Sequence, residues 1–486
     1  MRYYNQYKQM KRYFRKPLLF ISVAVFLFSC GKYDSEKEKN ITIIYTNDEH
    51  GWIEKEKQYQ GASGMVGAWK DSLNYDRNDD KFLVLSGGDM WTGPAISTWF
   101  EGASTVAVMN KMGYDAAVLG NHEFDFKVSQ LQAREKKMNF PILSANIRER
   151  KTSKIPSFVT PYIIKKANGI NVGIIGLSSI TTSHTAIKEN VTDYLFLPYD
   201  EVLKEFLPKM RKEGAEIIII IGHICEQEMR AILPLTKGYN IPVIGGGHCH
   251  REVLKLEDGV LLMETGSYLK NYIQVQLSYN SETKKVRIIA SSIEKNTKNS
   301  NDLEVEEIIT FWQQKVKTEL SKEIGYCSEK VLKNTPAMGN MITDSWLKAF
   351  PEADVAYSNF TSFGQDLPKG AITLENIIGV LPYVNTVIKV DLKGKDLLNK
   401  SKNRLLGGMN LTNGNQLSDG RIIHKDSTYT LLTSSYLYGH DSLETVSSKT
   451  INTKITCKKP LVDWIKSLET TSENPLNNYI DKKERQ

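Results

Sequence analysis

The sequence predicts an α/β protein, built as a layered α/β domain followed by a smaller α+β domain. Between residue 41 and about residue 297, short apolar or β-branched runs alternate with stretches of helical pattern, which indicates an α/β layered domain. The runs are continuously apolar, which is typical of strands buried on both faces. A polar, turn-rich segment at 294–302 then marks a change of pattern and a candidate domain boundary.

The predicted strands of the first domain are apolar runs that end in Gly-rich or polar turns. They are 41–45, 82–85, 116–119, 172–175, 217–221, 242–244 and 260–263. Helices are predicted between them, over 105–112, 129–137 and 200–211. The stretch 275–293 alternates like strands and closes this domain, which we assign to residues 41–297.

A helix is predicted after the boundary. Residues 303–324 carry apolar side chains at helical spacing and contain no Gly or Pro. We assign residues 298–326 to a linker helix between the domains. The second domain then covers residues 327–486, with a predicted helix over 338–350 and strands over 387–392 and 429–433.

The N-terminus has the pattern of a secretory signal. Residues 1–16 hold six basic and no acidic side chains, and residues 17–29 form an apolar run that is short for a membrane span. The sequence LFSCG at 27–31 resembles the lipobox of bacterial lipoproteins, which implies cleavage before Cys30 and acylation of its thiol. An uncleaved anchor is the alternative. We therefore expect an exported protein, anchored by lipid to a bacterial membrane, with residues 30–40 as a polar tether.

Charge and cysteine content exclude two classes of site. Six of the 63 basic residues lie in the leader, which leaves 57 against 56 acidic residues, so no basic surface for nucleic acid is expected. There is no C-x-x-C pair, which argues against a cysteine-type zinc site. Cys225 and Cys249 each lie within two residues of a clustered histidine and could pair in an oxidising compartment. We favour the interpretation that they are two small buried residues.

Five of the eight histidines lie in short clusters with acids, amides or glycines, and each cluster closely follows a predicted strand. The clusters, including one with a lone carboxylate, are Asp48-Glu49-His50, Gly87-Gly88-Asp89, Gly120-Asn121-His122-Glu123, Gly222-His223 and Gly247-His248-Cys249-His250. Ligand groups of layered α/β folds gather beyond the carboxyl ends of the strands. We therefore expect these side chains to converge.

The residue types in these clusters suit a metal centre. Imidazole nitrogen and carboxylate oxygen bind divalent zinc, manganese or iron. In Asp48-x-His50 and His248-x-His250, alternation along an extended segment would direct both side chains to one side. A single cluster is explained as well by a helix cap or a turn. Their conjunction argues against that explanation. A single carboxylate can bridge two ions, for which Asp89 is the candidate, and such a pair of ions can orient a phosphate group. His184 and His424 lie in no such cluster.

The clusters TNDEHG, SGGDMWTG, LGNHEFD, IGHI and GGHCH resemble those of the calcineurin-like metallophosphoesterases. In the second domain, GNMITD at 339–344 and LPYVN at 381–385 resemble the G-N-L-x-x-D and L-P-F-x-N elements of the bacterial 5′-nucleotidase family. The resemblance covers residues 41 to 463. It implies a four-layer α-β-β-α sandwich with a smaller C-terminal domain that contributes to substrate recognition.

The resemblance also implies roles for individual residues. One metal ion would be held by Asp48, His50, Asp89 and His250, and the other by Asp89, Asn121, His223 and His248. His122 and Asp125 would form a dyad that stabilises the transferring phosphoryl group or assists the leaving oxygen. The three-residue spacing of the dyad suits one helical turn, although a simple helix cap is an alternative.

The recognition elements of the second domain depart from the family pattern. In the segment that matches N-x-G-G-x-R, Asn359 is kept, but Gly364 stands where the family has arginine. A guanidinium is the preferred partner of phosphate or carboxylate oxygens. In the shortened turn at 436–441, Tyr436 could stack on a base and Asp441 could accept a hydrogen bond. Met409 is the nearest candidate for a second stacking partner, and Arg404 or Lys402 could replace the lost charge.

The sequence therefore predicts an extracytoplasmic phosphoesterase with two divalent metal ions that acts on nucleotides or related small phosphate esters. Within the same chemistry, a cyclic-nucleotide phosphodiesterase, a UDP-sugar hydrolase or a sulfur-ester hydrolase are alternatives. A surface-anchored binding protein derived from such an enzyme is an alternative of another class. A second domain that docks a protein or glycan through exposed Phe360 and Phe363 is a further one. The sequence does not indicate an oligomeric state.

Overall fold

The computed structural model describes residues 37–411 and 414–485. The predicted leader, Cys30 and the first part of the tether lie outside these residues. Strand β1 spans Glu38–Thr46, so it begins within the segment predicted to be tether. The reason is pairing with β13, because Glu38 lies opposite Asn280 and accepts hydrogen bonds from Ser278 and Asn280. In the part of the chain that is described, no helix is both long and apolar enough to cross a membrane.

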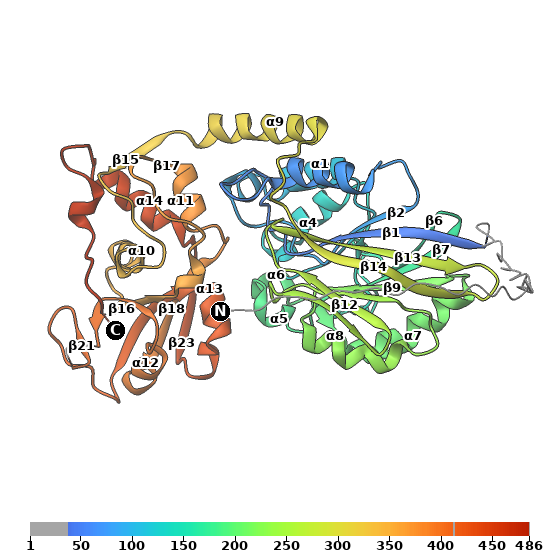
Figure 1. The fold of residues 1–486 in the computed structure, drawn as a ribbon. Helices are drawn as coiled ribbons and strands as arrows, with labels where there is room; N and C mark the ends of the chain where they lie inside the picture. The colour runs from blue at the N-terminus through green and yellow to red at the C-terminus, as the bar shows by residue number, and fades with distance from the viewer. Residues whose placement is uncertain (1–36, 412–413, 486) are drawn as a thin grey trace, which may run out of the picture. The chain divides into compact units, whose positions relative to one another are not determined.

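Two six-stranded sheets form the N-terminal half (Figure 1). The first has the order β14-β13-β1-β2-β3-β4, and the second has the order β11-β12-β10-β9-β7-β6. Strands β1 to β4 run parallel, as do β12, β10, β9 and β7, and antiparallel strands complete both sheets. Their bounds are β1 (Glu38–Thr46), β2 (Phe82–Ser86), β3 (Ala116–Val118), β4 (Ile142–Leu143), β6 (Tyr162–Ala167), β7 (Ile170–Leu177), β9 (Ile217–Gly222), β10 (Val243–Gly245), β11 (Glu252–Glu257), β12 (Val260–Thr265), β13 (Asn271–Asn280) and β14 (Lys285–Lys295).

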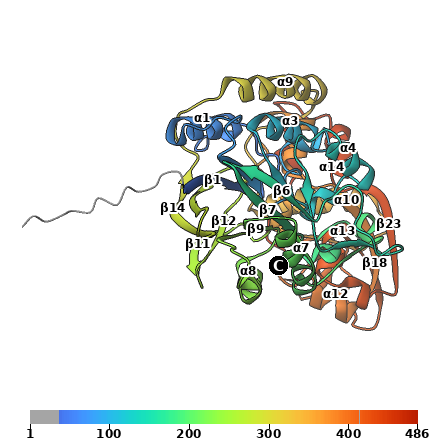
Figure 2. The same ribbon diagram turned by 90° about the vertical axis from the view of Figure 1, so that its right-hand side faces the viewer.

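Helices cover the outer faces of both sheets (Figure 2). Helices α1 (Gly61–Leu73) and α3 (Ala103–Met112) pack on the first sheet, and α7 (Tyr199–Lys212) and α8 (Glu226–Ile232) pack on the second. Side chains of a strand alternate between its two faces. Thus Ile219 lies between the sheets, whereas its neighbours Ile218 and Ile220 face α7 and α8. The result is the predicted α-β-β-α arrangement.

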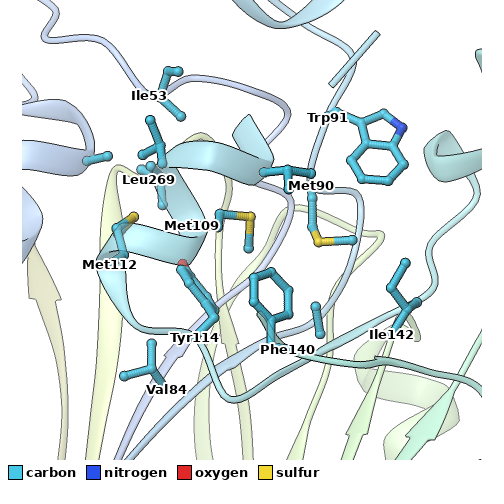
Figure 3. Packing of buried hydrophobic residues seen from close by; sticks show 14 of the residues in the cluster. Ile53, Val84, Met90, Trp91, Met109, Met112, Tyr114, Phe140, Ile142 and Leu269 are labelled. Carbon is cyan, nitrogen blue, oxygen red and sulfur yellow. The ribbon is translucent and has the colours of Figure 1, made fainter. Parts of the chain in front are cut away.

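The core under α1 and α3 shows how an outer layer is packed (Figure 3). Met109 and Met112 of α3 meet Val84 of β2 and Tyr114 in one buried cluster. Helix α9 (Leu303–Leu320), which occupies most of the predicted linker helix, adds Val305 and three further apolar side chains to the same cluster. Its first turn is capped by Asp302, whose carboxylate accepts a hydrogen bond from the backbone N–H of Val305 at 2.9 Å.

The C-terminal half contains a five-stranded mixed sheet of order β19-β16-β22-β18-β23 and a two-stranded sheet of β15 and β17. Its own buried clusters surround Trp346 on one face and Tyr357 on the other. The strands are β15 (Glu323–Cys327), β16 (Val355–Ser358), β17 (Gly370–Thr373), β18 (Thr386–Lys393), β19 (Leu405–Gly407), β22 (Thr428–Ser434) and β23 (Lys449–Thr456). The helices are α10 (Pro336–Ala349), α11 (Leu374–Val380), α12 (Gly394–Lys400), α13 (Ser435–His440) and α14 (Lys458–Ser467).

Candidate active site

The structure brings together all seven predicted metal ligands, which lie on loops that follow five strands. Asp48 and His50 follow β1, Asp89 follows β2, Asn121 follows β3, His223 follows β9, and His248 and His250 follow β10. The first three strands belong to one sheet and the last two to the other. The carboxyl edges of both sheets therefore supply one common site, as expected from the position of the clusters.

The donor atoms form two adjoining groups. In one group, Nε2 of His250 lies 3.1 Å and Nε2 of His50 lies 4.0 Å from Oδ1 of Asp48. In the other, Nε2 of His223 lies 3.0 Å from Oδ2 of Asp89 and 3.2 Å from Nδ1 of His248. Oδ1 of Asn121 is 3.1 Å from the same His223 nitrogen. Asp89 connects the groups, because its Oδ2 is also 3.9 Å from Nε2 of His50.

Backbone carbonyls orient two of the histidines. Nδ1 of His50 donates to the carbonyl oxygen of Thr92 at 3.0 Å, and Nδ1 of His223 donates to that of Gly87 at 2.9 Å. These hydrogen bonds fix the orientation of both rings and place Nε2 of each on the side of the carboxylates. Metal-binding histidines are commonly held by such a second hydrogen bond.

The prediction that Asp-x-His and His-x-His act through an extended backbone is wrong. Five of the seven residues have positive φ: Asp48 at 51°, His50 at 46°, Asp89 at 56°, His248 at 73° and His250 at 53°. Asp and His tolerate this left-handed region better than most residues. The loops follow one another closely, since the N–H groups of Asp48 and His50 donate to the carbonyls of Gly88 and Asp89, each at 2.9 Å. Tight bends, not strand alternation, direct the side chains inward.

The electrostatics of the site favour a divalent cation. Asp48 and Asp89 are buried, and their ion-pair partners among the described residues are histidines. Burial opposes the charge of Asp89, but the nearby His223 and His122 outweigh it and hold its pKa well below the usual range. Burial lowers the pKa of His50 to about 3, which keeps its imidazole neutral. Two buried carboxylates, four imidazoles and an amide oxygen form a donor set that fits divalent metal ions.

His122 and Asp125 lie beside this site as a hydrogen-bonded pair. The 3₁₀ helix η1 (His122–Phe124) places Nδ1 of His122 2.8 Å from Oδ2 of Asp125. Burial opposes protonation of His122, but the carboxylates of Asp125 and Asp89 outweigh it and raise the pKa of the imidazole to about 9. The imidazole is therefore a cation at neutral pH. His122 also lies close enough to His50 and Asp89 to be a third donor there.

Glu123 holds the ligand loops in place, a role that was not predicted from the sequence. Its buried carboxylate accepts three backbone hydrogen bonds, from Asp89 at 3.0 Å, Met90 at 2.8 Å and Gly120 at 2.7 Å. A Cβ atom at Gly120 would lie 2.1 Å from Oδ1 of Asp89, so only glycine fits beside that side chain. The acid in the G-N-H-E cluster was the available signal, but its partners are backbone groups that a sequence does not reveal.

Cys225 and Cys249 form a disulfide, with Cα atoms 5.4 Å apart. Our favoured interpretation, two small buried residues, is therefore wrong. Cys249 is exposed and Cys225 is partly exposed, so the two cysteines are not buried core residues. The bond joins the loop after β9, which carries His223, to the loop after β10, which carries His248 and His250.

Two cavities adjoin the site. The larger has a volume of about 780 Å³, and His50, His250, Trp52, Tyr268 and Phe360 are among its lining residues. The smaller, of about 160 Å³, is lined by His122 and Asp125 together with Tyr383 and Tyr436. Tyr383 and Thr361 line both cavities. The metal-ligand region and the His122–Asp125 pair thus each open into a cavity walled partly by the C-terminal half.

Comparison with known families is consistent with this geometry. Residues 41–252 match the calcineurin-like phosphoesterase family, and residues 315–401 match the 5′-nucleotidase C-terminal domain. The chain belongs to the calcineurin-like phosphoesterases that carry a 5′-nucleotidase C-terminal domain. Its family consists of hydrolases of phosphate esters that use divalent metals.

Named relatives extend the likeness to most of this phosphoesterase. A 5′-nucleotidase of Vibrio cholerae is 25% identical over 443 residues, which cover 79% of this chain and 80% of the relative. The snake venom 5′-nucleotidase of Gloydius brevicauda is 28% identical over 429 residues, 78% of this chain and 72% of the relative. The crystal structure of a 5′-nucleotidase precursor from Thermus thermophilus superposes with a TM-score of 0.71 at 21% identity. The superposition covers 89% of this chain and 97% of the Thermus thermophilus chain.

Of the predicted substrate-recognition residues of the phosphoesterase, some lie at a cavity and others are bound to or buried among other residues. Tyr436 lines the smaller cavity and stacks on His440. Asn359 follows β16, and its amide binds Thr361 and Ser362, which shapes the turn that lines both cavities.

Asp441 lines neither cavity. Its carboxylate accepts hydrogen bonds from Arg404, at 2.5 and 3.1 Å, and from Tyr357 at 2.9 Å, so a substrate would have to displace one of them. Arg404 is thus engaged in this ion pair. Met409 is fully buried, so it is not available as a second stacking partner.

A lysine lies near the position of the missing arginine. Nζ of Lys333 donates to the carbonyl oxygen of Gly364 at 3.0 Å, and both residues line the larger cavity. A Cβ atom at Gly364 would lie 2.6 Å from the carbonyl oxygen of Gly379, which leaves no room for an arginine there. Lys333 was not predicted from the sequence, because it is distant from the altered motifs along the chain.

Proposed function

We propose that this protein is an extracytoplasmic 5′-nucleotidase-type phosphoesterase with a dinuclear metal centre. The observation that carries the proposal is the convergence of seven donor side chains from the ends of both sheets beside the His122–Asp125 pair. One ion would be held by Asp48, His50, Asp89 and His250, and the other by Asp89, Asn121, His223 and His248. Asp89 would contribute to both, since its carboxylate lies near histidines of both groups.

The metal ions and the protein side chains have separate tasks. When bound, two divalent ions act as Lewis acids and activate water for attack on a phosphate ester. The donor set of imidazole, carboxylate and amide groups suits zinc, manganese or iron. Asp125 holds the His122 imidazole in its protonated form, and Nε2 is then free to donate to the phosphoryl or leaving oxygen.

The larger cavity supports a nucleotide as substrate. Its volume of about 780 Å³ lies within the range of small-molecule sites, whereas about 160 Å³ is too small for a nucleoside. Trp52, Tyr268 and Phe360 offer ring faces for a base, while Lys333 and Lys270 offer positive charge. Tyr436 would contact the part of the substrate nearest His122. Relatives named as 5′-nucleotidases support the same substrate class.

A substrate panel with the purified protein tests this function. The panel contains AMP, a cyclic nucleotide, a UDP-sugar, a sulfur ester and an aryl phosphate, each assayed with added manganese or zinc. Phosphate release from AMP supports the proposal, and preference for another member identifies a different substrate. Two bound metal equivalents without turnover of any member would overturn the enzyme function in favour of a binding protein.

The same proposal includes export and lipid anchoring. The Cys225–Cys249 disulfide supports it, because disulfides persist in oxidising compartments. The basic and apolar leader with Cys30 supports it independently. Replacement Cys30→Ala should move the protein out of the membrane fraction and abolish labelling by a fatty acid. Unchanged fractionation and labelling would refute the anchor.

A further inference from the structure

The Cys225–Cys249 disulfide lies among the proposed histidine ligands. Cys225 is two residues after His223, and Cys249 stands between His248 and His250. The bond therefore joins the two ligand loops that arise from the second sheet. It closes a ring across 24 residues of sequence separation, and three of the seven proposed ligands lie within or beside it.

Hydrogen bonds anchor the chain next to both cysteines of the bond. The N–H of Cys225 donates to Glu228 at 2.9 Å, and the following residues form α8. On the other side, Gly246 and Gly247 are anchored by backbone hydrogen bonds to Met263 and Ile224.

Beyond these anchors, His248 and His250 take left-handed backbone conformations, and Cys249 between them is exposed. The N–H of His248 is held by Asp48, itself a proposed ligand. The disulfide is thus the covalent restraint on the exposed part of this loop.

We propose that this disulfide is a thiol-sensitive lock that keeps the His248–His250 loop in its metal-holding conformation and so sets metal retention. The proposal rests on the ligand assignment of the proposed function. Without the bond, the loop can leave its left-handed conformations, which separates the imidazoles of His248 and His250 from the carboxylates. The exposure of Cys249 allows a thiolate to reach it.

The switching step is a thiol–disulfide exchange with a dithiol. One thiolate of the dithiol attacks a sulfur of the Cys225–Cys249 bond, which breaks and releases the other sulfur as a thiolate that takes up a proton. The second thiol of the reductant then closes to its own disulfide and releases the protein thiol. Two electrons and two protons pass to the protein, and Cys225 and Cys249 become thiols.

Metal release is the measurement that tests the lock. The manganese-loaded protein is challenged with a chelator in its oxidised form, after reduction with dithiothreitol, and as the double variant C225S/C249S. Reduction and the double substitution should each speed metal loss by roughly 10- to 100-fold, if the rate follows the loss of affinity that is typical when hydrogen-bonding partners of metal ligands are removed. Dithiothreitol should not change the double variant, which controls for chelation by the reductant.

Activity separates a lock from a general effect on folding. The metal concentration for half-maximal activity should rise while kcat at saturating metal stays within about threefold. C327A, at a free buried cysteine, controls for cysteine replacement. If thiol counting confirms reduction and metal loss keeps its oxidised rate, the lock is refuted although the enzyme function stands. If the oxidised protein holds no metal, the ligand assignment itself fails.

Discussion

The ring of Tyr383 stacks on the imidazole of His122, with ring centroids 5.6 Å apart and planes at 26°. Tyr383 belongs to the C-terminal half, far from His122 in the sequence, yet it borders both cavities. Its pKa is raised mainly by burial, so its hydroxyl stays uncharged at neutral pH. The C-terminal half thus contacts the proposed proton donor directly.

Removal of this ring should weaken catalysis through His122. Stacked aromatic pairs contribute about 0.5–1.5 kcal/mol, so Tyr383→Leu should lower kcat by about two- to tenfold. Tyr383→Phe keeps the ring and should retain most of the activity. Steady-state kinetics on AMP measure both variants. Equal kcat for Tyr383→Leu and the wild type would show that the contact has no catalytic effect.

Replacement of His122 distinguishes a proton donor from a metal ligand. His122→Ala should lower kcat by about 10²- to 10⁴-fold, the usual contribution of acid–base catalysis. Metal content should stay at the wild-type value, because the seven proposed ligands remain. Elemental analysis alongside kinetics provides the measurement, with His184→Ala at an exposed site as the control. Joint loss of metal and turnover would identify His122 as a ligand.

Glu123→Gln should disturb the ligand loops without touching a ligand. An amide in place of the carboxylate directs N–H groups at backbone N–H groups of Asp89, Met90 or Gly120. A buried donor left unsatisfied costs about 1–3 kcal/mol. We expect a lower melting temperature and weaker metal binding, measured by calorimetry with and without metal. Glu201→Gln, at an exposed carboxylate of α7, should change neither.

Two lysines three residues apart test the recognition of the substrate. Lys333 lines the larger cavity, whereas Lys330 forms an ion pair with Asp366 at 3.0 Å and is not among the residues that line it. Loss of a charge-assisted hydrogen bond costs roughly 1.5–3 kcal/mol, so Lys333→Ala should raise KM for AMP by about tenfold or more. Lys330→Ala should leave KM within about twofold of the wild-type value. The same KM for both variants would remove Lys333 from recognition.

Lys458 should make stability depend on pH. It begins α14, and burial is the main cause that lowers its pKa from 10.5 to about 8. Between these values the unfolded chain binds the proton more tightly than the folded one, so the free energy of unfolding rises with pH across that window. Lys458→Met removes this dependence. It should be more stable than the wild type at pH 7 by on the order of 2 kcal/mol.

Urea unfolding at several pH values measures the difference between Lys458→Met and the wild type. The difference should shrink as pH rises from about 8 towards 10.5. A constant difference across this range would show that Lys458 is charged in the folded protein throughout.

The sequence predicted which side chains converge, but not the backbone conformation and cross-links of the loops that carry them. Apolar runs followed by His and Asp clusters place the ligands at strand ends, and this rule depends only on the fold class. The backbone of those loops was predicted wrongly, because positive φ at Asp48 or His250 comes from hydrogen bonds between loops that are distant in sequence. The disulfide was misjudged for the same reason, since spacing alone gives no Cα separation.

Contacts between distant segments explain why other residues of the site were not predicted. Glu123 binds backbone groups, and the cation near Gly364 comes from another segment. Neither partner leaves a pattern in the local sequence. The helices and strands themselves were predicted well where their apolar period is long, as in α7, and their ends shifted by one to a few residues, as at β1.

The left-handed backbone at five of the proposed ligands limits how the metal preference of this enzyme can be re-engineered. Asparagine, aspartate, histidine and glycine accept such a conformation readily, whereas β-branched residues adopt it rarely, as Thr92 does here at a φ of 81°. An exchange of aspartate for asparagine at Asp48 or Asp89 changes the charge of the centre and keeps a residue type that accepts the left-handed conformation. Threonine or valine at the same positions would reshape the loop first. Variants that alter the metal preference are therefore limited to a few residue types at these five positions. At Asn121 and His223, whose φ is not positive, the backbone permits a wider choice of residue types.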